Sequence, residues 1–181
     1  MISNVEYLVK PYIDSKDLPI DGCAKMEISS RVHNPFIEVL REISRKNISP
    51  DEYLNKMLLL WKDRVDYVAS DSNSLFVMID IFRDDSYRPI QLIQLRDYAT
   101  AKLHNRFVSL YSGYDTAKYL ANQEVLDKVL NIHAYGEISD RCASGETNEL
   151  VRELKQLDSS VNICVNFDKN LCPDTIDGKF D

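Results

Sequence analysis

Leu75-Phe76-Val77-Met78-Ile79-Asp80-Ile81-Phe82 is an apolar run of eight residues that precedes the acidic turn Asp84-Asp85-Ser86. Its length and its content of Phe, Val and Ile favour a buried β-strand, but periodicity alone does not separate such a run from a core helix. As a strand it would pair with residues 161–167, where apolar and polar residues alternate. As a helix it would join a bundle, so the fold class depends on this run.

Most of the remaining chain shows helical periodicity. Ser49-Pro50-Asp51-Glu52 is a capping box with Pro at the first helical position, and it opens a helix that reaches Val68. Similar apolar spacing predicts further helices over residues 35–46, 89–113, 115–121, 125–136 and 150–157. The first 33 residues fit either a short helix or an edge strand followed by a loop.

These patterns predict a mostly α protein of about six helices packed as a bundle, with a small two-stranded β element formed by residues 75–82 and 161–167. The alternative is an α+β fold. Residues 1–167 are expected to form a single helix-rich globular domain, because the chain of 181 residues has the size of one domain. Residues 168–181 are expected to form a polar C-terminal tail.

The charge distribution excludes some classes of partner. The formal net charge is −7 and no run of Lys and Arg supplies a basic face, so we expect no nucleic-acid binding. The chain shows neither a secretory signal nor the roughly 20 consecutive apolar residues of a membrane span, so we expect no membrane association and a cytoplasmic location. An acidic surface suits a basic protein partner.

No familiar catalytic motif is present. The sequence lacks the glycine-rich phosphate loops, the Gly-x-Ser-x-Gly turn and the His-Glu-x-x-His pair, and it predicts no cofactor. The best indication of an enzyme is the group Asp80, Asp84 and Asp85. If residues 75–82 form a strand, these carboxylates cluster at its end, where they could hold Mg²⁺.

The histidines and cysteines give weaker indications. His104 follows Asp97 by two helical turns, which could orient a general base. His133 and the three cysteines at 142, 164 and 172 could supply four zinc ligands, but zinc ligands usually come in tight sequence pairs. With these spacings, buried free thiols are the simpler interpretation.

Aromatic side chains are concentrated around Gly113. The candidate partner-binding residues are Tyr98, Phe107, Tyr111, Tyr114 and Tyr119. Tyrosine is favoured at recognition surfaces because it combines a large contact area with a polar tip.

The functional hypothesis is therefore a protein-interaction module (a regulator, adaptor, inhibitor or immunity-type protein) that acts by binding a protein partner. Its alternative is a small metal-dependent hydrolase or nuclease that uses the acidic cluster. Self-association into a homodimer through the tyrosine surface is a third hypothesis.

Overall fold

The computed structural model describes residues 1–9, 50–80, 88–123, 126–136 and 143–168. Strands and helices alternate along these residues. They are β1 (Ile2–Val9), α2 (Pro50–Ser70), β2 (Ser74–Ile79), α3 (Ile90–Leu103), a 3₁₀ turn (His104–Arg106), β3 (Phe107–Leu110), α4 (Gly113–Ala121), β4 (Leu126–Gly136), α5 (Ser144–Leu157) and β5 (Asn162–Phe167).

The five strands form one parallel sheet in the order β3-β2-β1-β4-β5. This is the order of Rossmann-type doubly wound sheets. The chain builds outward from β1 to β2 and β3, then returns to the other side of β1 to add β4 and β5. The boundary between β1 and β4 is therefore the topological switch point. In such sheets, ligands bind at the carboxyl ends of the strands beside this boundary.

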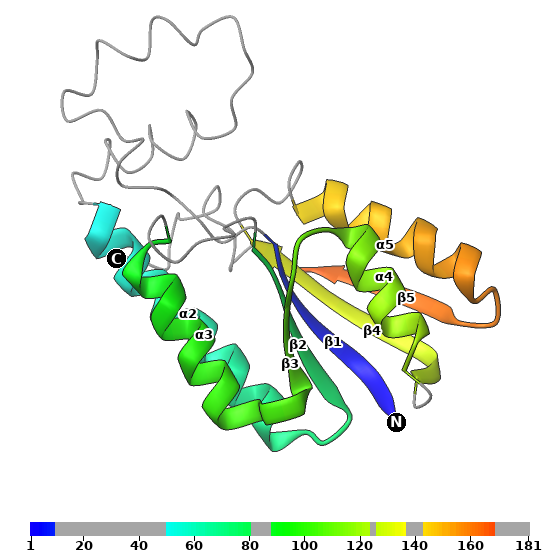
Figure 1. Ribbon diagram of the computed structural model, residues 1–181, viewed down its shortest axis with the longest axis horizontal. Coiled ribbons are helices and arrows are strands. Elements are labelled where there is room, and N and C mark those ends of the chain that lie inside the picture. Colours follow the sequence, from blue (N-terminus) through cyan, green and yellow to red (C-terminus); the bar gives the residue numbers. More distant parts are fainter. Residues whose placement is uncertain (10–49, 81–87, 124–125, 137–142, 169–181) are drawn as a thin grey trace, which may run out of the picture.

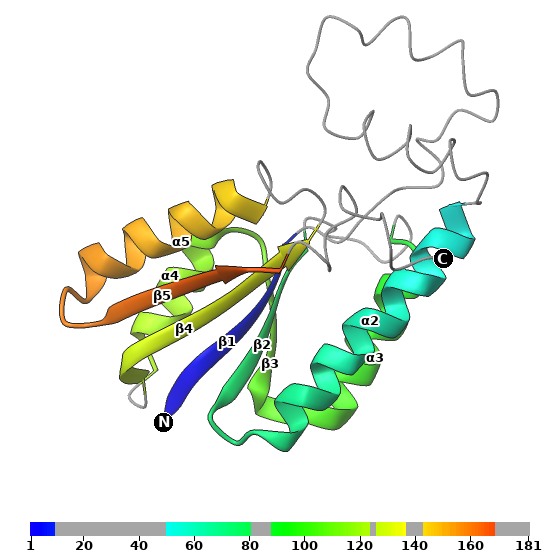
Figure 2. The ribbon, with the colours of Figure 1, turned by 180° about the vertical axis from the view of Figure 1, so that it is seen from behind.

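Helices cover the two faces of the sheet in pairs (Figure 1). Helices α2 and α3 pack on one face over a core that includes Leu8, Phe76 and Met78. Helices α4 and α5 pack on the other face, where the core includes Val5, Val77 and Ile132. The view from behind shows the same three-layer arrangement (Figure 2). Alternate residues of each strand thus enter two separate cores, as the period of a strand requires.

The prediction of a mostly α, six-helix bundle is wrong. Among the described residues there are four α-helices and five strands, which form an α/β fold. The runs at 75–82 and 161–167 do not form a two-stranded element either, because β1 and β4 lie between β2 and β5. Residues 2–9, for which the sequence fitted either a short helix or an edge strand, form the central strand β1.

Two predicted helices contain strands. The helix expected over residues 89–113 ends at Leu103, because His104 adopts φ 51°, and Phe107–Leu110 then pair with β2. The helix expected over 125–136 is β4, in which buried Leu130, Ile132 and Ala134 alternate with residues on the opposite face. In both segments, pairing with a central strand outweighed a short stretch of helical spacing.

Other predictions are confirmed. Helix α2 begins at Pro50, the position that the capping box predicted, and β2 and β5 are strands. Helices α4 and α5 include the helices expected over 115–121 and 150–157, but they begin earlier than expected, at Gly113 and Ser144. The predicted helix over 35–46 lies outside the described residues. Within the described part of the chain, no helix combines the length and apolar character that a bilayer crossing requires.

Candidate functional site

On the face of the sheet that packs against α2 and α3, the side chains change from mostly apolar to mostly polar at β1. Over β2 and β3 this face is apolar and covered by the two helices. Over β1, β4 and β5 it carries polar residues in two register rows. These rows are Asn4, Asn131 and Cys164, and then Glu6, His133 and Asn166. Asn131, Cys164 and Asn166 are exposed, so this half of the face is an open polar surface beside the switch point.

Glu6 is a buried carboxylate at the centre of this surface. Its side chain is only 4% exposed, whereas Arg64 of α2 and His133 of β4 are 24% and 22% exposed. Arg64 donates from Nε to Glu6 Oε2 at 3.0 Å and from Nη2 to Oε1 at 2.5 Å. His133 Nδ1 lies 3.1 Å from both carboxylate oxygens. A buried charge in a central strand is costly unless it is paired, and Glu6 is paired twice.

Two opposing effects set the protonation of Glu6. Burial raises the pKa of the Glu6 carboxyl, but the hydrogen bonds and charges of His133 and Arg64 outweigh it and hold this pKa below its ordinary value of 4.5. Glu6 is therefore anionic at neutral pH.

The contacts of His133 define which ring nitrogen carries a proton. A carboxylate only accepts hydrogen bonds, so the Glu6 oxygens, 3.1 Å from Nδ1, favour a proton on that nitrogen more strongly than the Asp168 carboxylate, at 3.4 Å, favours a proton on Nε2. Arg64 Nη2 also lies 3.2 Å from Nδ1, where it shares Glu6 Oε1 with the imidazole. On the far side of the ring, Nε2 lies 3.4 Å from Oδ2 of Asp168, the residue after β5. The imidazole is thus held between two carboxylates.

Tyr135 lies next to His133 on the same face of β4. Its ring meets the His133 ring edge-on, with centroids 5.5 Å apart. The Tyr135 hydroxyl is buried close to the Glu6–Arg64 pair, although it makes no hydrogen bond of good geometry in the described structure. Burial, and then the negative charge of Glu6, raise the pKa of this hydroxyl well above 10, so it stays a proton donor.

A second possible ligand position, the N-terminus of α4, is already occupied by carboxylates of α5. The amides of Gly113 and Tyr114 donate to Glu146 Oε2 at 2.9 Å and to Glu149 Oε2 at 3.3 Å. The next amide, of Asp115, donates to the capping Ser112 hydroxyl at 3.1 Å. Free helix N-termini bind phosphates through such amides. Here the same donors join α4 to α5.

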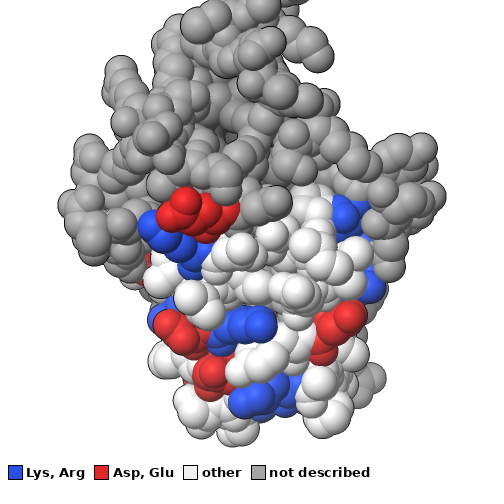
Figure 3. All heavy atoms as spheres, turned by 90° about the vertical axis from the view of Figure 1, so that its left-hand side faces the viewer, with Lys and Arg blue, Asp and Glu red and all other residues white. Residues whose placement is uncertain are grey.

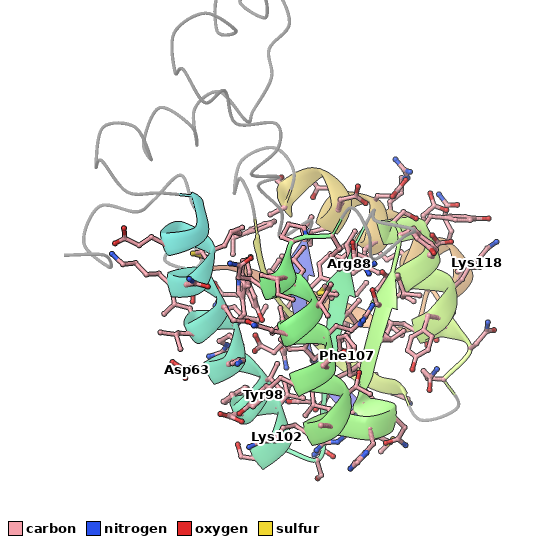
Figure 4. The ribbon with its side chains drawn as sticks, turned by 60° about the vertical axis from the view of Figure 1, so that its left-hand side comes forward. Asp63, Arg88, Tyr98, Lys102, Phe107 and Lys118 are labelled. Atoms are coloured by element: carbon pink, nitrogen blue, oxygen red, sulfur yellow. The ribbon has the colours of Figure 1, made fainter. Side chains whose placement is uncertain are left out.

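The acidic cluster predicted at 80, 84 and 85 is described only at Asp80. This carboxylate follows β2, is buried, and accepts from Arg88 Nε at 2.8 Å (Arg88 is labelled in Figure 4). Asp84 and Asp85 lie outside the described residues. Within the described ranges, no three His, Cys, Asp or Glu side chains gather closely enough to hold a metal ion.

The five aromatic residues predicted to bind a partner lie on several elements. Tyr98 of α3 donates to Asp66 of α2 at 2.7 Å, and Phe107 packs against the α2/α3 core. Tyr119 packs against the opposite core, while Tyr111 and Tyr114, around the start of α4, are 55% and 43% exposed. Figure 4 shows the separation: Tyr98 and Phe107 lie near α3, whereas Lys118, whose ammonium covers the Tyr114 ring, lies on α4. The exposed pair is therefore Tyr111 and Tyr114.

The remaining candidates do not converge. His104 and Asp97 are both exposed and share no hydrogen bond in the described structure. Of the four proposed zinc ligands, Cys142 and Cys172 lie outside the described residues, and Cys164 is an exposed free thiol. The outer side of α2 and α3 mixes positive and negative side chains, with pairs such as Lys102–Asp66, and shows no large patch of one sign (Figure 3).

The Glu6–His133 pair could not be predicted from local sequence patterns. These patterns group His133 with three cysteines and assign no role to Glu6. One signal was available: Glu6 interrupts the apolar stretch from Val5 to Val9. Its partner is 127 residues away and is brought to it only by the β1–β4 pairing.

Comparisons with protein-family models, with curated proteins and with solved structures find no match to this chain.

Proposed function

We propose that this protein is an enzyme that binds a small polar substrate on the open face of β1, β4 and β5 and uses His133 as a general acid–base. The observation that carries the proposal is the buried Glu6 carboxylate, which holds His133 Nδ1 at 3.1 Å across the switch point while the imidazole stays partly exposed. Pairs of this kind, a histidine oriented by a buried carboxylate, are the acid–base unit of many active sites.

The location supports the proposal independently of the pair. Doubly wound sheets bind their ligands beside the switch point, toward the carboxyl ends of the strands. Glu6 lies three residues before the end of β1, His133 three residues before the end of β4, and Asp168 directly after β5. The amides of Asn131 and Asn166 on the same open face add donors and acceptors for a polar substrate.

The chemistry follows from the two faces of the imidazole. Glu6 keeps a proton on Nδ1, so Nε2 is the nitrogen that takes a proton from a substrate hydroxyl or from water. The imidazolium formed lies between Glu6 and Asp168, whose negative charges stabilise it. Glu6 is not itself protonated during this step, because its pKa lies below 4.5. In the reverse direction, Nε2 returns the proton to a leaving group.

The test is an untargeted conversion assay. The full-length protein is incubated with a metabolite extract, and mass spectrometry follows the compounds consumed and formed. Removing a general acid–base typically lowers a rate by about 10²–10⁴-fold, so His133→Asn should abolish the conversion seen with wild type. His104→Asn is the matched control, since His104 is exposed at the end of α3, and it should leave the conversion unchanged. No conversion by wild type, or equal conversion by His133→Asn, would refute the proposal.

A second candidate function is protein binding through the exposed tyrosines. Tyr111 and Tyr114 present large aromatic surfaces to solvent around the start of α4. On this hypothesis, the double variant Tyr111→Ala/Tyr114→Ala should lose a partner that wild type captures from its own cells, at unchanged circular dichroism. Retention of every captured partner by the variant would remove this surface from consideration.

A further inference from the structure

Within the described part of the chain, strand β5 is an edge of the sheet that lacks the usual protection. It pairs with β4 on one side, and no described strand pairs with its other side. The six residues Asn162–Phe167 contain no charged residue, no Pro and no Gly, and their register with β4 runs without a bulge. Natural edge strands are normally protected by charges, Pro, bulges or short length, because free backbone donors and acceptors invite another strand.

The other edge shows the contrast. Strand β3 has only four residues, and the residue before it is Arg106. Strand β5 is longer, and at its middle Cys164 and Val165 are both exposed, the valine by 38%. Exposure of a β-branched residue on an unpaired edge is the feature that strand addition removes.

From this edge we infer that β5 pairs with β5 of a second copy, antiparallel across a two-fold axis, so that two sheets become one. We assign the pairing partner of this edge to β5 of a second copy, because the edge carries no charge and its backbone donors and acceptors are complementary to those of an identical antiparallel strand. Pairing it with itself brings no like charges opposite each other, and a two-fold axis satisfies both free edges with one closed contact.

The alternation of side chains between the two faces of the sheet limits the possible registers of this pairing. A two-fold axis perpendicular to the sheet keeps the open polar face on the same side in both copies. Residues of that face, such as Cys164, must therefore lie opposite residues of the same face in the second copy. The two registers that pair most of the strand place Cys164 opposite either its own counterpart or Asn166 of the second copy. In both, Cys164 lies opposite or diagonal to its counterpart.

The inference does not depend on the proposed enzyme function, but it has a consequence for it. Asn166 is the register partner of His133, and β5 separates His133 from the edge. A second copy would therefore extend the open face around His133 and place the two candidate sites side by side on one continuous surface.

The experiment measures the mass of the full-length protein by light scattering after size-exclusion chromatography under reducing conditions. Wild type should be a dimer. Cys164→Lys should be a monomer, because like charges that face each other across an interface should weaken the association by roughly 100-fold or more. Cys164→Ser is the neutral control and should remain a dimer. Asn131→Lys, on the same face and in the same register row but on β4, controls for added charge and should also remain a dimer.

A second readout locates the interface. Amide hydrogen exchange of residues 162–167 should be slower in wild type than in Cys164→Lys at matched circular dichroism. A monomeric wild type would overturn the inference. A dimer that Cys164→Lys leaves intact, or one in which exchange of β5 is the same in both proteins, would overturn it as well.

Discussion

Replacing Glu6 by Gln should destabilise the protein far more than its small change in shape suggests. Three donors converge on the two Glu6 oxygens: Nε and Nη2 of Arg64, and Nδ1 of His133. Glutamine keeps the size of the side chain but offers one acceptor and one amide group, so at least one donor then faces another donor. The substitution also leaves the Arg64 charge without its buried counter-ion.

The magnitude follows from the burial of the pair. Removing one partner of a fully buried ion pair costs about 3–5 kcal/mol. Arg64 keeps some contact with solvent, which reduces the penalty, so we expect Glu6→Gln to lower the free energy of unfolding by about 2–3 kcal/mol. Asp168→Asn is the control: its contact with His133 is longer, at 3.4 Å, and half-buried, and should contribute less than about 1 kcal/mol.

The loss of stability caused by Glu6→Gln should depend on pH. The pKa of Glu6 is lower in the folded protein than the ordinary value of 4.5, so its stabilisation is complete above the unfolded pKa and is lost as the pH falls through the folded one. The difference between wild type and Glu6→Gln should therefore be present at neutral pH and shrink as the pH falls below about 4.5. Urea unfolding can be followed by the fluorescence of Trp61, the one tryptophan of the chain, which is buried. A difference below about 0.5 kcal/mol at neutral pH, within the range of ordinary surface substitutions, would refute the reasoning.

Three further substitutions test how the fold is held around the site. Arg106 donates to main-chain carbonyls at and beyond the C-terminal end of α2. Arg106→Ala should therefore lower the free energy of urea unfolding by about 2–3 kcal/mol. A loss under about 1 kcal/mol would contradict this role. A methyl group on Gly136 would overlap the carbonyl oxygen of Val9 at the switch point. Gly136→Ala should therefore cost about 1–3 kcal/mol, and an unchanged melting temperature would disprove the close approach. Ser112 caps α4: its hydroxyl accepts from the Asp115 amide and donates to the Asp115 carboxylate. Ser112→Ala should therefore cost about 1 kcal/mol, whereas Ser112→Thr, which keeps the hydroxyl, should restore most of it in the same unfolding assay.

The local elements with strong chemical signals could be predicted from the sequence. Pro50 within a capping box marked the start of α2, and the β-branched and aromatic residues of 75–82 marked β2. These signals act over a few residues, within which backbone sterics and side-chain capping decide the structure.

The number of strands could not be predicted, because two strands depend on partners far away. Residues 126–136 have apolar positions that fit a helix at their start and a strand from Leu130 onward. Pairing with β1 decides in favour of the strand. Residues 107–110 are too short to show a period, and β2 defines them as a strand. With two strands missing, the remaining pattern resembled a bundle.

The candidate site depends on the same long-range pairing. Neither Glu6 nor His133 has a neighbour in sequence that indicates a role, and each is ordinary by composition. Only the β1–β4 register places them opposite each other. By contrast, Asp80, Asp84 and Asp85 are close together along the chain, so a site made of these carboxylates can be proposed from the sequence without knowing the topology.

On the proposed function, Glu6 orients His133 so that Nε2 is the nitrogen available for proton transfer. The most direct measurement is long-range ¹H–¹⁵N NMR of the His133 ring, assigned by comparison with His133→Asn, because the ¹⁵N shifts show which ring nitrogen carries the proton. In wild type, the neutral ring should carry its proton on Nδ1, and in Glu6→Gln this preference should be lost. A neutral ring protonated on Nε2 in wild type, or a tautomer that Glu6→Gln leaves unchanged, would contradict the account.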